Sequence, residues 1–237
     1  MLKAIFFDLD CTLLPMDQDK FIENYFLRLT GYLENFGYDR RAVKKHVFQG
    51  TVAMQSNDGR ATNEEVFWNY FSGALGAETL QHKSIFEDFY KTEFQLVKEV
   101  CGVEPAAAAM VKLLKAKGYP LVLATNPLFP AIATQSRVRW AGLEPSDFVH
   151  ITTYENSSFA KPNPAYYREI LDKLGYCPEE CLMVGNDAAE DMAAEQTGMH
   201  VFLLTKLLIN ADHRDISQYP QGDFDDLKAY MEALEQS

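Results

Sequence analysis

Short apolar runs alternate with amphipathic stretches over most of the chain. Runs typical of strands buried on both faces of a sheet occur at residues 4–7, 121–124, 148–152, 181–184 and 201–204. Apolar residues at helical spacing lie between them, at residues 105–117, 128–140, 164–174, 188–197 and 223–234. Strands that alternate with helices in this way predict an α/β fold with a Rossmann-like parallel sheet and right-handed crossovers.

One long segment interrupts this alternation. Residues 16–98 carry apolar side chains at helical spacing and no strand pattern. Within it, Thr62 and Glu65 fit a capping box at the start of a helix. The first strand is thus separated from the second by helices alone. We predict an all-helical cap domain at residues 16–98, inserted into an α/β core formed by residues 1–15 and 99–237.

Composition and charge narrow the classes of partner. The chain has 237 residues, of which 47% are hydrophobic, and a formal net charge of −12. The negative charge argues against nucleic acid and against anionic membrane surfaces. We expect no signal peptide and no membrane span, because the first apolar run is short and no other run is long enough. We therefore expect a cytoplasmic protein that is a monomer or a small homo-oligomer.

Two acids follow the first predicted strand directly. Asp8 and Asp10 stand at its carboxyl end, which is where ligands bind in open α/β sheets. The alternation of side chains along an extended chain places both carboxylates on the same side. Two adjacent buried carboxylates repel each other, so we expect a shared cation, and Mg²⁺ suits their oxygen donors. The alternative is that the pair only caps the following turn.

Three further polar clusters also follow predicted strands. Thr125 and Asn126 either offer a hydroxyl, an amide and N–H groups to a phosphate or cap the next helix. Lys161 lies in a stiff Ala-Lys-Pro loop, where an ammonium can hold carboxylates together and bind phosphate, although a lone lysine is usually solvated. Asp187 and Asp191 can face one way near a helix start, but helix capping explains them as well. The functional interpretation therefore rests on the clusters jointly.

Together these clusters resemble the four motifs of the haloacid dehalogenase superfamily. Asp8-x-Asp10-x-Thr12 matches the first motif in its phosphatase form. The Thr-Asn, Lys-Pro and Gly-Asn-Asp clusters then follow in the order that the superfamily uses. The helical insertion after the first motif looks like the C1 cap class, as in phosphoglycolate phosphatase and its relatives. The chain is identified as a member of this superfamily by that resemblance.

The resemblance implies a catalytic role for the matching positions. Asp8 would be the nucleophile and a metal ligand. Asp10 would be the general acid/base, with its backbone carbonyl on Mg²⁺. Thr125, with the amide of Asn126, would bind the phosphoryl oxygens. Lys161 would bind both the phosphate and Asp8.

The fourth motif and the turn after Asp8 depart from the usual pattern. The resemblance implies that Asp187 and Asp191 serve the metal directly or through water. Asn186 stands where many relatives place the acid, so either Asn186 or Asp187 is the direct ligand, and we favour the carboxylate. Cys11 occupies a position where glycine is frequent, and its thiol is a candidate for oxidation or alkylation.

The implied activity is Mg²⁺-dependent hydrolysis of small phosphorylated metabolites through an aspartyl-phosphate. An acid at position 10 favours phosphoryl transfer over dehalogenation, because a leaving halide needs no proton. A phosphomutase on the same core and a catalytically silent binding or regulatory protein are the alternatives. We expect the cap to select the substrate. Five cations in the cap either contact a second anionic group of the substrate or form a solvated charged face: Arg40, Arg41, Lys44, Lys45 and Arg60.

Overall fold

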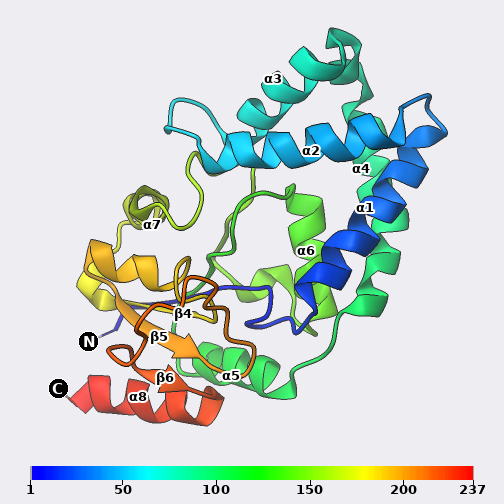
Figure 1. Cartoon of the computed structure of the whole chain (residues 1–237). Coiled ribbons are helices and arrows are strands. Elements are labelled where there is room, and N and C mark those ends of the chain that lie inside the picture. The colour runs from blue at the N-terminus through cyan, green and yellow to red at the C-terminus, as the bar shows by residue number, and fades with distance from the viewer. Residues whose placement is uncertain (1, 237) are drawn as a thin grey trace.

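Six parallel strands form one sheet in the computed structural model, which describes residues 2–236, with side chains through residue 234 (Figure 1). The strands are β1 (Ala4–Phe7), β2 (Leu121–Leu123), β3 (His150–Ile151), β4 (Cys181–Gly185), β5 (His200–Leu204) and β6 (Gln221–Gly222). Their order is β3-β2-β1-β4-β5-β6, and every pairing is parallel. The expected α/β fold is confirmed. The order reverses at β1, whose carboxyl end therefore opens into the crevice where such sheets bind ligands.

Helices occupy most of the rest of the chain. Between β1 and β2 lie α1 (Gln18–Glu34), α2 (Arg40–Gln55), α3 (Asn63–Leu75), η1 (Ala77–His82), α4 (Lys83–Lys91), η2 (Glu93–Val100) and α5 (Pro105–Ala116). The later helices are α6 (Ala131–Trp140), η3 (Pro145–Asp147), α7 (Pro164–Leu174), η4 (Pro178–Glu180), η5 (Met192–Thr197) and α8 (Phe224–Gln236). Within the described residues, no helix combines the length and the apolar character needed to cross a bilayer.

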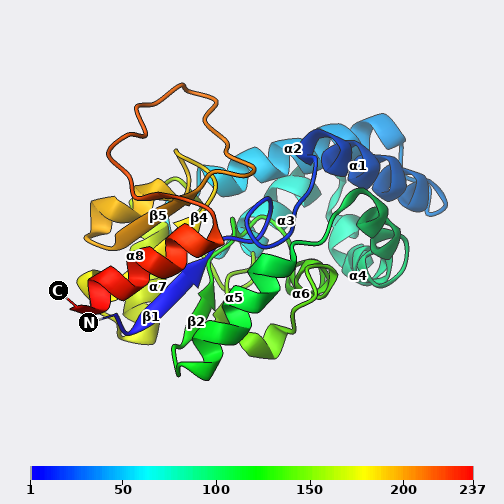
Figure 2. The same ribbon diagram turned by 90° about the horizontal axis from the view of Figure 1, so that it is seen from below.

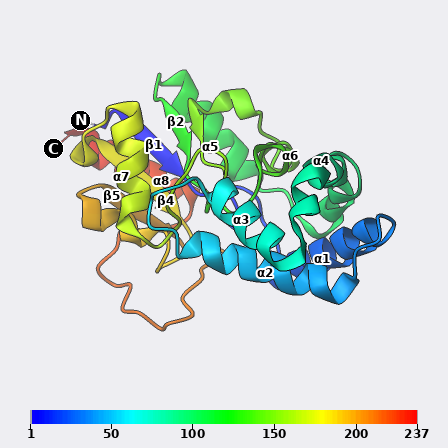
Figure 3. The same ribbon diagram turned by 90° about the horizontal axis from the view of Figure 1, so that it is seen from above.

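The sheet is covered on both faces, as its uninterrupted apolar strands predict. Ile5 and Phe7 of β1 belong to one hydrophobic cluster, and Ala4 and Phe6 belong to another. The first cluster includes side chains of α5 and α8, which lie together on one face of the sheet (Figure 2). The second includes side chains of α7 and η5, and α7 lies on the opposite face (Figure 3). The alternation of side chains along β1 thus separates the two layers of helices.

The structure differs from the sequence-based expectations mainly at element ends. Helix α6 begins at Ala131 rather than at 128, because Pro130 precedes it in an extended conformation. The helix expected over 188–197 is instead a run of turns followed by the short helix η5. A sixth strand, β6, lies at the end of the segment 206–222 that reads as a surface loop. Two-residue strands such as β6 leave no apolar run for the sequence to reveal.

The helices α1 to η2 form the segment that follows β1, and its two connections to the rest of the chain lie side by side. The Gly102 N–H donates to the Pro15 carbonyl at 2.7 Å, and Met16 pairs with Cys101 in an antiparallel bridge. Its side chains also continue the hydrophobic cluster on one face of the sheet, with the Phe94 ring 5.1 Å from that of Trp140 in α6. The division of the chain into two domains stays a prediction.

The start of α3 makes a second attachment between the helical segment and the loops beyond the sheet. The backbone N–H groups of Asn63 and Glu64 donate to the carbonyls of Ser157 and Tyr154, each at 2.8 Å. The fully buried Asn63 amide also donates to the carbonyls of Pro127 and Phe159, at 3.2 Å each. The N-terminal N–H groups of a helix lack partners inside it, so the loops supply acceptors that α3 needs.

Candidate active site

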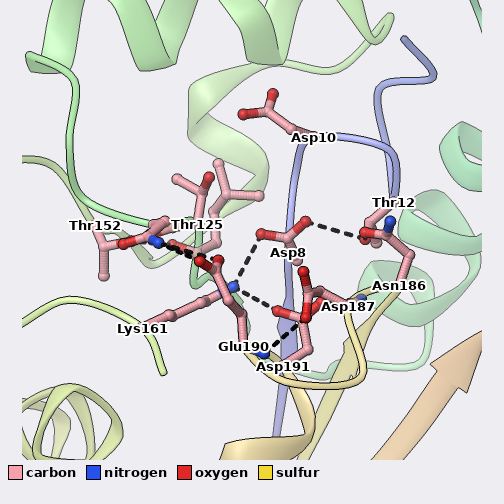
Figure 4. A network of polar contacts seen from close by, with 12 residues as sticks. Asp8, Asp10, Thr12, Thr125, Thr152, Lys161, Asn186, Asp187, Glu190 and Asp191 are labelled. Atoms are coloured by element: carbon pink, nitrogen blue, oxygen red, sulfur yellow. Dashed lines mark hydrogen bonds and ion pairs between the residues drawn. The ribbon is translucent and has the colours of Figure 1, made fainter. Parts of the chain in front are cut away.

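Three charged side chains meet at the carboxyl edge of the sheet. The Lys161 ammonium lies 2.9 Å from Asp8 Oδ1 and 2.6 Å from Asp191 Oδ1 (Figure 4). Asp8 directly follows β1, whereas Asp191 lies beyond the loop after β4. All three residues are buried, and Lys161 is only 1% exposed. The structure therefore brings together one predicted residue from each of three distant motifs.

The charge on Lys161 is maintained by its two partners. Burial alone would lower the pKa of this lysine, but the charges of Asp191 and Asp8 raise it well above its ordinary value. The close packing also depends on Gly185, since a Cβ at that position would overlap the Asp191 carboxylate. The site thus holds a fixed ammonium beside the predicted nucleophile.

The Thr12 hydroxyl links the ends of β1 and β4. It lies 3.1 Å from Asp8 Oδ2 and 2.8 Å from Asn186 Oδ1. The Asn186 amide is fixed in this orientation because its Nδ2 donates to the Leu207 carbonyl at 2.7 Å. Asp187 Oδ1 instead accepts the N–H groups of Ala189 and Glu190, which is the capping arrangement. Asn186 therefore lies beside Asp8, while the Asp187 side chain stabilises the turn in which it lies.

Asp191 is engaged at both of its carboxylate oxygens. One accepts from Lys161, and the other accepts the Asp187 N–H at 2.9 Å. This geometry suits a residue that positions Lys161 and closes the loop after β4.

Thr125 and Asn126 follow β2 as predicted, but they do not cap the next helix. Helix α6 begins five residues after Asn126, and its first N–H, of Ala131, donates to the Glu155 carboxylate at 2.9 and 3.0 Å. The Asn126 amide donates to both carboxylate oxygens of Glu190, at 3.0 Å each. The interpretation that Thr125 and Asn126 cap the next helix is therefore wrong. The Glu155 carboxylate accepts the first N–H group of α6 instead.

Asp10 lies apart from the Asp8 cluster. Its carboxylate pairs with Arg137 of α6, and Figure 4 shows it turned away from Asp8 and Lys161. Burial raises the pKa of Asp10 above its ordinary value, although the Arg137 charge opposes that shift. Asp10 Oδ1 and Arg137 Nε are buried without a hydrogen-bond partner. A partly exposed carboxyl group with a raised pKa is suited to exchange a proton with a bound molecule.

Cys11 adopts the backbone conformation that explains why glycine is frequent at such a position. Its φ is +63°, in the left-handed region. The thiol is 8% exposed and donates to the Met16 carbonyl at 3.3 Å. Burial raises its pKa to about 11, so little thiolate forms at neutral pH. Oxidation or alkylation at Cys11 is therefore disfavoured.

A cavity of about 420 Å³ extends from Asp10 into the helical segment. Its polar lining includes Asp10, Asn126, Arg137 and Glu190. Most of the remaining wall is aromatic or aliphatic and comes from α1, α2, α3, α4 and the loop between β2 and α6. The five cations considered as anion contacts, Arg40, Arg41, Lys44, Lys45 and Arg60, are not among the residues that line it.

The side-chain atoms around Thr12 that could bind a metal are oxygens. Among residues 2–236, no group of three or more His, Cys, Asp or Glu side chains is arranged to hold a metal ion. The oxygens that do converge are the Asp8 carboxylate and the Asn186 amide, both beside the Thr12 hydroxyl. Such hard donors fit Mg²⁺ rather than a softer metal.

Sequence reasoning did not single out Arg137 or Glu190. Arg137 is 1% exposed and lies four residues after the buried Ala133 and three before the buried Trp140. These buried neighbours place Arg137 on the inward face of α6, but the apolar residues of this helix do not form one stripe in the sequence, so the sequence did not mark that face. No sequence signal marked Glu190 either, because its contact with Asn126 depends on how two separate loops approach each other.

Comparison with known proteins shows the family of this chain. A family model described as haloacid dehalogenase-like hydrolase matches residues 2–198. The chain is 28% identical over 206 residues to a phosphoglycolate phosphatase of Vibrio vulnificus, covering 86% of this chain and 84% of that protein. It is 24% identical over 249 residues to a glyceraldehyde 3-phosphate phosphatase of Methanothermobacter thermautotrophicus, covering 99% and 100%. A solved 2-haloacid dehalogenase of Pseudomonas syringae pv. Tomato superposes with a TM-score of 0.64 at 20% identity, covering 99% and 100%.

Proposed function

Because this chain belongs to the haloacid dehalogenase-like hydrolases, we propose that it is a phosphatase acting on small phosphate monoesters. The observation that carries this proposal is the buried Lys161 ammonium between Asp8 and Asp191 at the carboxyl edge of the sheet. A phosphoryl group approaching Asp8 meets a fixed positive charge there, in a protein whose formal net charge is −12. The phosphatases among its relatives support the same class of reaction.

Asp10 favours phosphate esters over haloacids as substrates. A leaving alkoxide must be protonated, whereas a leaving halide need not be. The raised pKa of Asp10 keeps more of its carboxyl protonated than an ordinary aspartate would be. A phosphomutase that uses the same residues remains the second candidate, distinguished by transfer of the phosphoryl group to a second substrate hydroxyl instead of to water.

Asp8 is the proposed nucleophile. One of its carboxylate oxygens attacks phosphorus, and the bond from phosphorus to the leaving oxygen breaks in an in-line displacement. Asp10 gives its proton to that leaving oxygen. Asp10 then takes a proton from the water that attacks the aspartyl-phosphate, which restores both carboxyl groups. Lys161 and the Thr125–Asn126 segment hold the phosphoryl oxygens during both steps.

We also propose that the site works with Mg²⁺. The residues that would hold it are Asp8, the backbone carbonyl of Asp10, and either Asn186 or Asp187, with Asp191 acting through Lys161. When bound, Mg²⁺ offsets phosphoryl charge that would otherwise repel the Asp8 carboxylate. The amide of Asn186 is better placed than our sequence-based preference for Asp187 implied, because it shares the Thr12 hydroxyl with Asp8.

Hydrolysis assays with and without metal test this function. We expect release of inorganic phosphate from a generic aryl phosphate, its loss in EDTA, and its recovery when Mg²⁺ is added back. We expect Asp8→Asn to abolish turnover with an unchanged circular dichroism spectrum, because an amide does not attack phosphorus. Full activity in EDTA contradicts the metal assignment, and an active Asp8→Asn protein contradicts the nucleophile.

A further inference from the structure

The cavity beside Asp10 is apolar where a leaving group would lie. A general acid must touch the oxygen that it protonates. In a substrate whose phosphoryl group sits on Asp8 and Lys161, the organic part beyond that oxygen therefore extends past Asp10. The space on that side is the cavity of about 420 Å³. Its walls then contact the organic part of the substrate.

Aromatic rings form much of this wall. Phe26, Phe67, Trp68, Phe129 and Tyr154 all line the cavity, and each comes from the helical segment or from a loop that faces it. Several of them pack against neighbouring rings, as in the edge-on pair of Phe67 and Trp68 at 5.4 Å. Ring faces and aliphatic side chains of this kind favour apolar groups, because their contact with water is lost on binding.

The charges around the cavity do not favour a second anionic group. Among the described residues that line it, Arg137 is the single cation, and it is already paired with Asp10. Glu190 adds a second carboxyl group to the same wall. A carboxylate on the substrate would therefore lose its hydration and would have to share the Arg137 charge with Asp10.

Three residues that line the cavity carry buried polar atoms without a hydrogen-bond partner. Asp10 Oδ1, Asn126 Oδ1 and Arg137 Nε are buried and have no hydrogen-bond partner in the structure. All three residues also line the cavity. The lining thus combines a few polar residues with a large apolar surface, which is the composition of a small-molecule site.

We infer that the natural substrate is a phosphate monoester with an uncharged, largely apolar organic part that fills this aromatic cavity. This inference rests on the proposed phosphatase function and adds the substrate class to it. It separates this chain from an enzyme whose substrate carries a carboxylate next to the phosphate. The preference comes from the apolar wall, so it acts on the organic group rather than on the phosphate.

Two alkyl phosphates with equivalent leaving oxygens test the inference. Hydrolysis of 3-phenylpropyl phosphate and of propyl phosphate breaks the same kind of bond, so a difference in kcat/KM reports burial of the phenyl ring. We expect 3-phenylpropyl phosphate to be favoured on the order of 10- to 100-fold. We expect 2-phosphoglycolate and glyceraldehyde 3-phosphate to be poorer than 3-phenylpropyl phosphate. The corresponding phosphonates should show the same order in calorimetric binding.

A pair of variants on α2 locates the effect. Thr51 lines the cavity, whereas the adjacent Val52 is 43% exposed and is not among the lining residues. Thr51→Trp should fill the cavity and lower the preference for the phenyl compound at least about five-fold. Val52→Trp should leave the preference unchanged. Circular dichroism of both variants checks that they fold.

The outcomes separate this inference from the function on which it rests. Equal kcat/KM for the two alkyl phosphates, or a preference for 2-phosphoglycolate, overturns the apolar substrate class and leaves the phosphatase function standing. A protein that hydrolyses neither compound but binds the phenylpropyl phosphonate more tightly than the propyl phosphonate overturns the phosphatase function. The assignment of the cavity to an apolar group then still stands. Equal effects of Thr51→Trp and Val52→Trp on the preference also contradict the assignment.

Discussion

Glu190 is a buried carboxyl group whose pKa is strongly shifted by its surroundings in the site. It receives two hydrogen bonds from Asn126, and burial raises its pKa to about 8 from an ordinary value of 4.5. Lys161 opposes this shift, while the charges of Asp191, Asp187 and Asp8 add to it. Between these two values the folded protein holds a proton that the unfolded chain has released.

We predict that this proton makes the metal-free protein less stable as pH rises from about 5 to 8. The unfolded state binds fewer protons in this range, so the free energy of unfolding falls with increasing pH. Glu190→Gln stays uncharged throughout and should remove on the order of 2 kcal/mol of that fall. Urea unfolding in EDTA at both ends of this pH range measures the free energy of unfolding of wild type and Glu190→Gln. Glu195→Gln, at an exposed position, is the control. Parallel pH dependences of wild type and Glu190→Gln would contradict the raised pKa.

Residues at strand ends were predictable, whereas residues brought in by tertiary packing were not. Asp8 and Lys161 follow predicted strands, so the rule that ligands bind at the carboxyl edge was enough to place them together. Arg137 lies in the middle of a helix, where an arginine is normally solvated, and its pairing with Asp10 depends on the position of the whole helix. The sequence could not decide between Asn186 and Asp187, because the Leu207 carbonyl that orients the Asn186 amide lies in a loop far along the chain.

At the scale of elements, α3 ties the helical segment to the loops around the site. Asn63 satisfies three buried groups through its side chain, since its Oδ1 also accepts from Asn57 at 2.8 Å. This attachment lies far along the chain from Pro15 and Gly102, where the two connections pair. A segment that closes over the site by rotating about those connections must keep or break the contacts of Asn63. We predict that the segment closes over the site with hinges near residues 14–15 and 101–102.

We predict that Asn63→Ala loosens this attachment. The substitution leaves the carbonyls of Pro127 and Phe159 without their donor, so it should lower the free energy of unfolding by about 2–4 kcal/mol. Amide hydrogen exchange should rise at the start of α3 and in the loop around Ser157. Asn69→Ala, at an exposed position of the same helix, is the matched control. Unchanged exchange in Asn63→Ala would show that the contact does not hold the segment.

Helix positions were more predictable than strand lengths. The capping box of Thr62 and Glu65 forms as expected, and Gly175 ends α7 with a φ of 71°. Side-chain chemistry within a few residues sets such ends. By contrast, β3 is shorter than the strand expected at residues 148–152, and β6 was not expected; pairing with a neighbouring strand sets the limits of both.

At the scale of the whole molecule, one hydrophobic cluster spans the helical segment and the sheet. It includes Phe21 and Leu29 of α1 together with Ile5 and Leu121 of the sheet. A sequence-based division into cap and core does not reveal this continuity, because each part has enough apolar residues for a core of its own. Shared burial couples the two parts energetically.

We predict that the two parts unfold in one transition. The chain has two tryptophans, with Trp68 in α3 and Trp140 in α6. Fluorescence of Trp68→Phe therefore reports the part that contains α6. Fluorescence of Trp140→Phe reports the helical segment that contains α3. Their unfolding midpoints should coincide with the circular dichroism midpoint of the same variant. Separate midpoints for fluorescence and circular dichroism within one variant would instead show an independently folding helical domain.

The central claim is that Asp8 carries the phosphoryl group during turnover, and chemical trapping tests it most directly. Borohydride reduces an acyl phosphate to an alcohol, so quenching the reaction during turnover should convert Asp8 into homoserine. Mass spectrometry of the peptide that contains residues 4–12 detects this change. We predict homoserine at position 8 only when substrate is present, and none in a Lys161→Met protein that does not turn over. Continued phosphate release with an unmodified Asp8, or homoserine at another acid, would contradict the account.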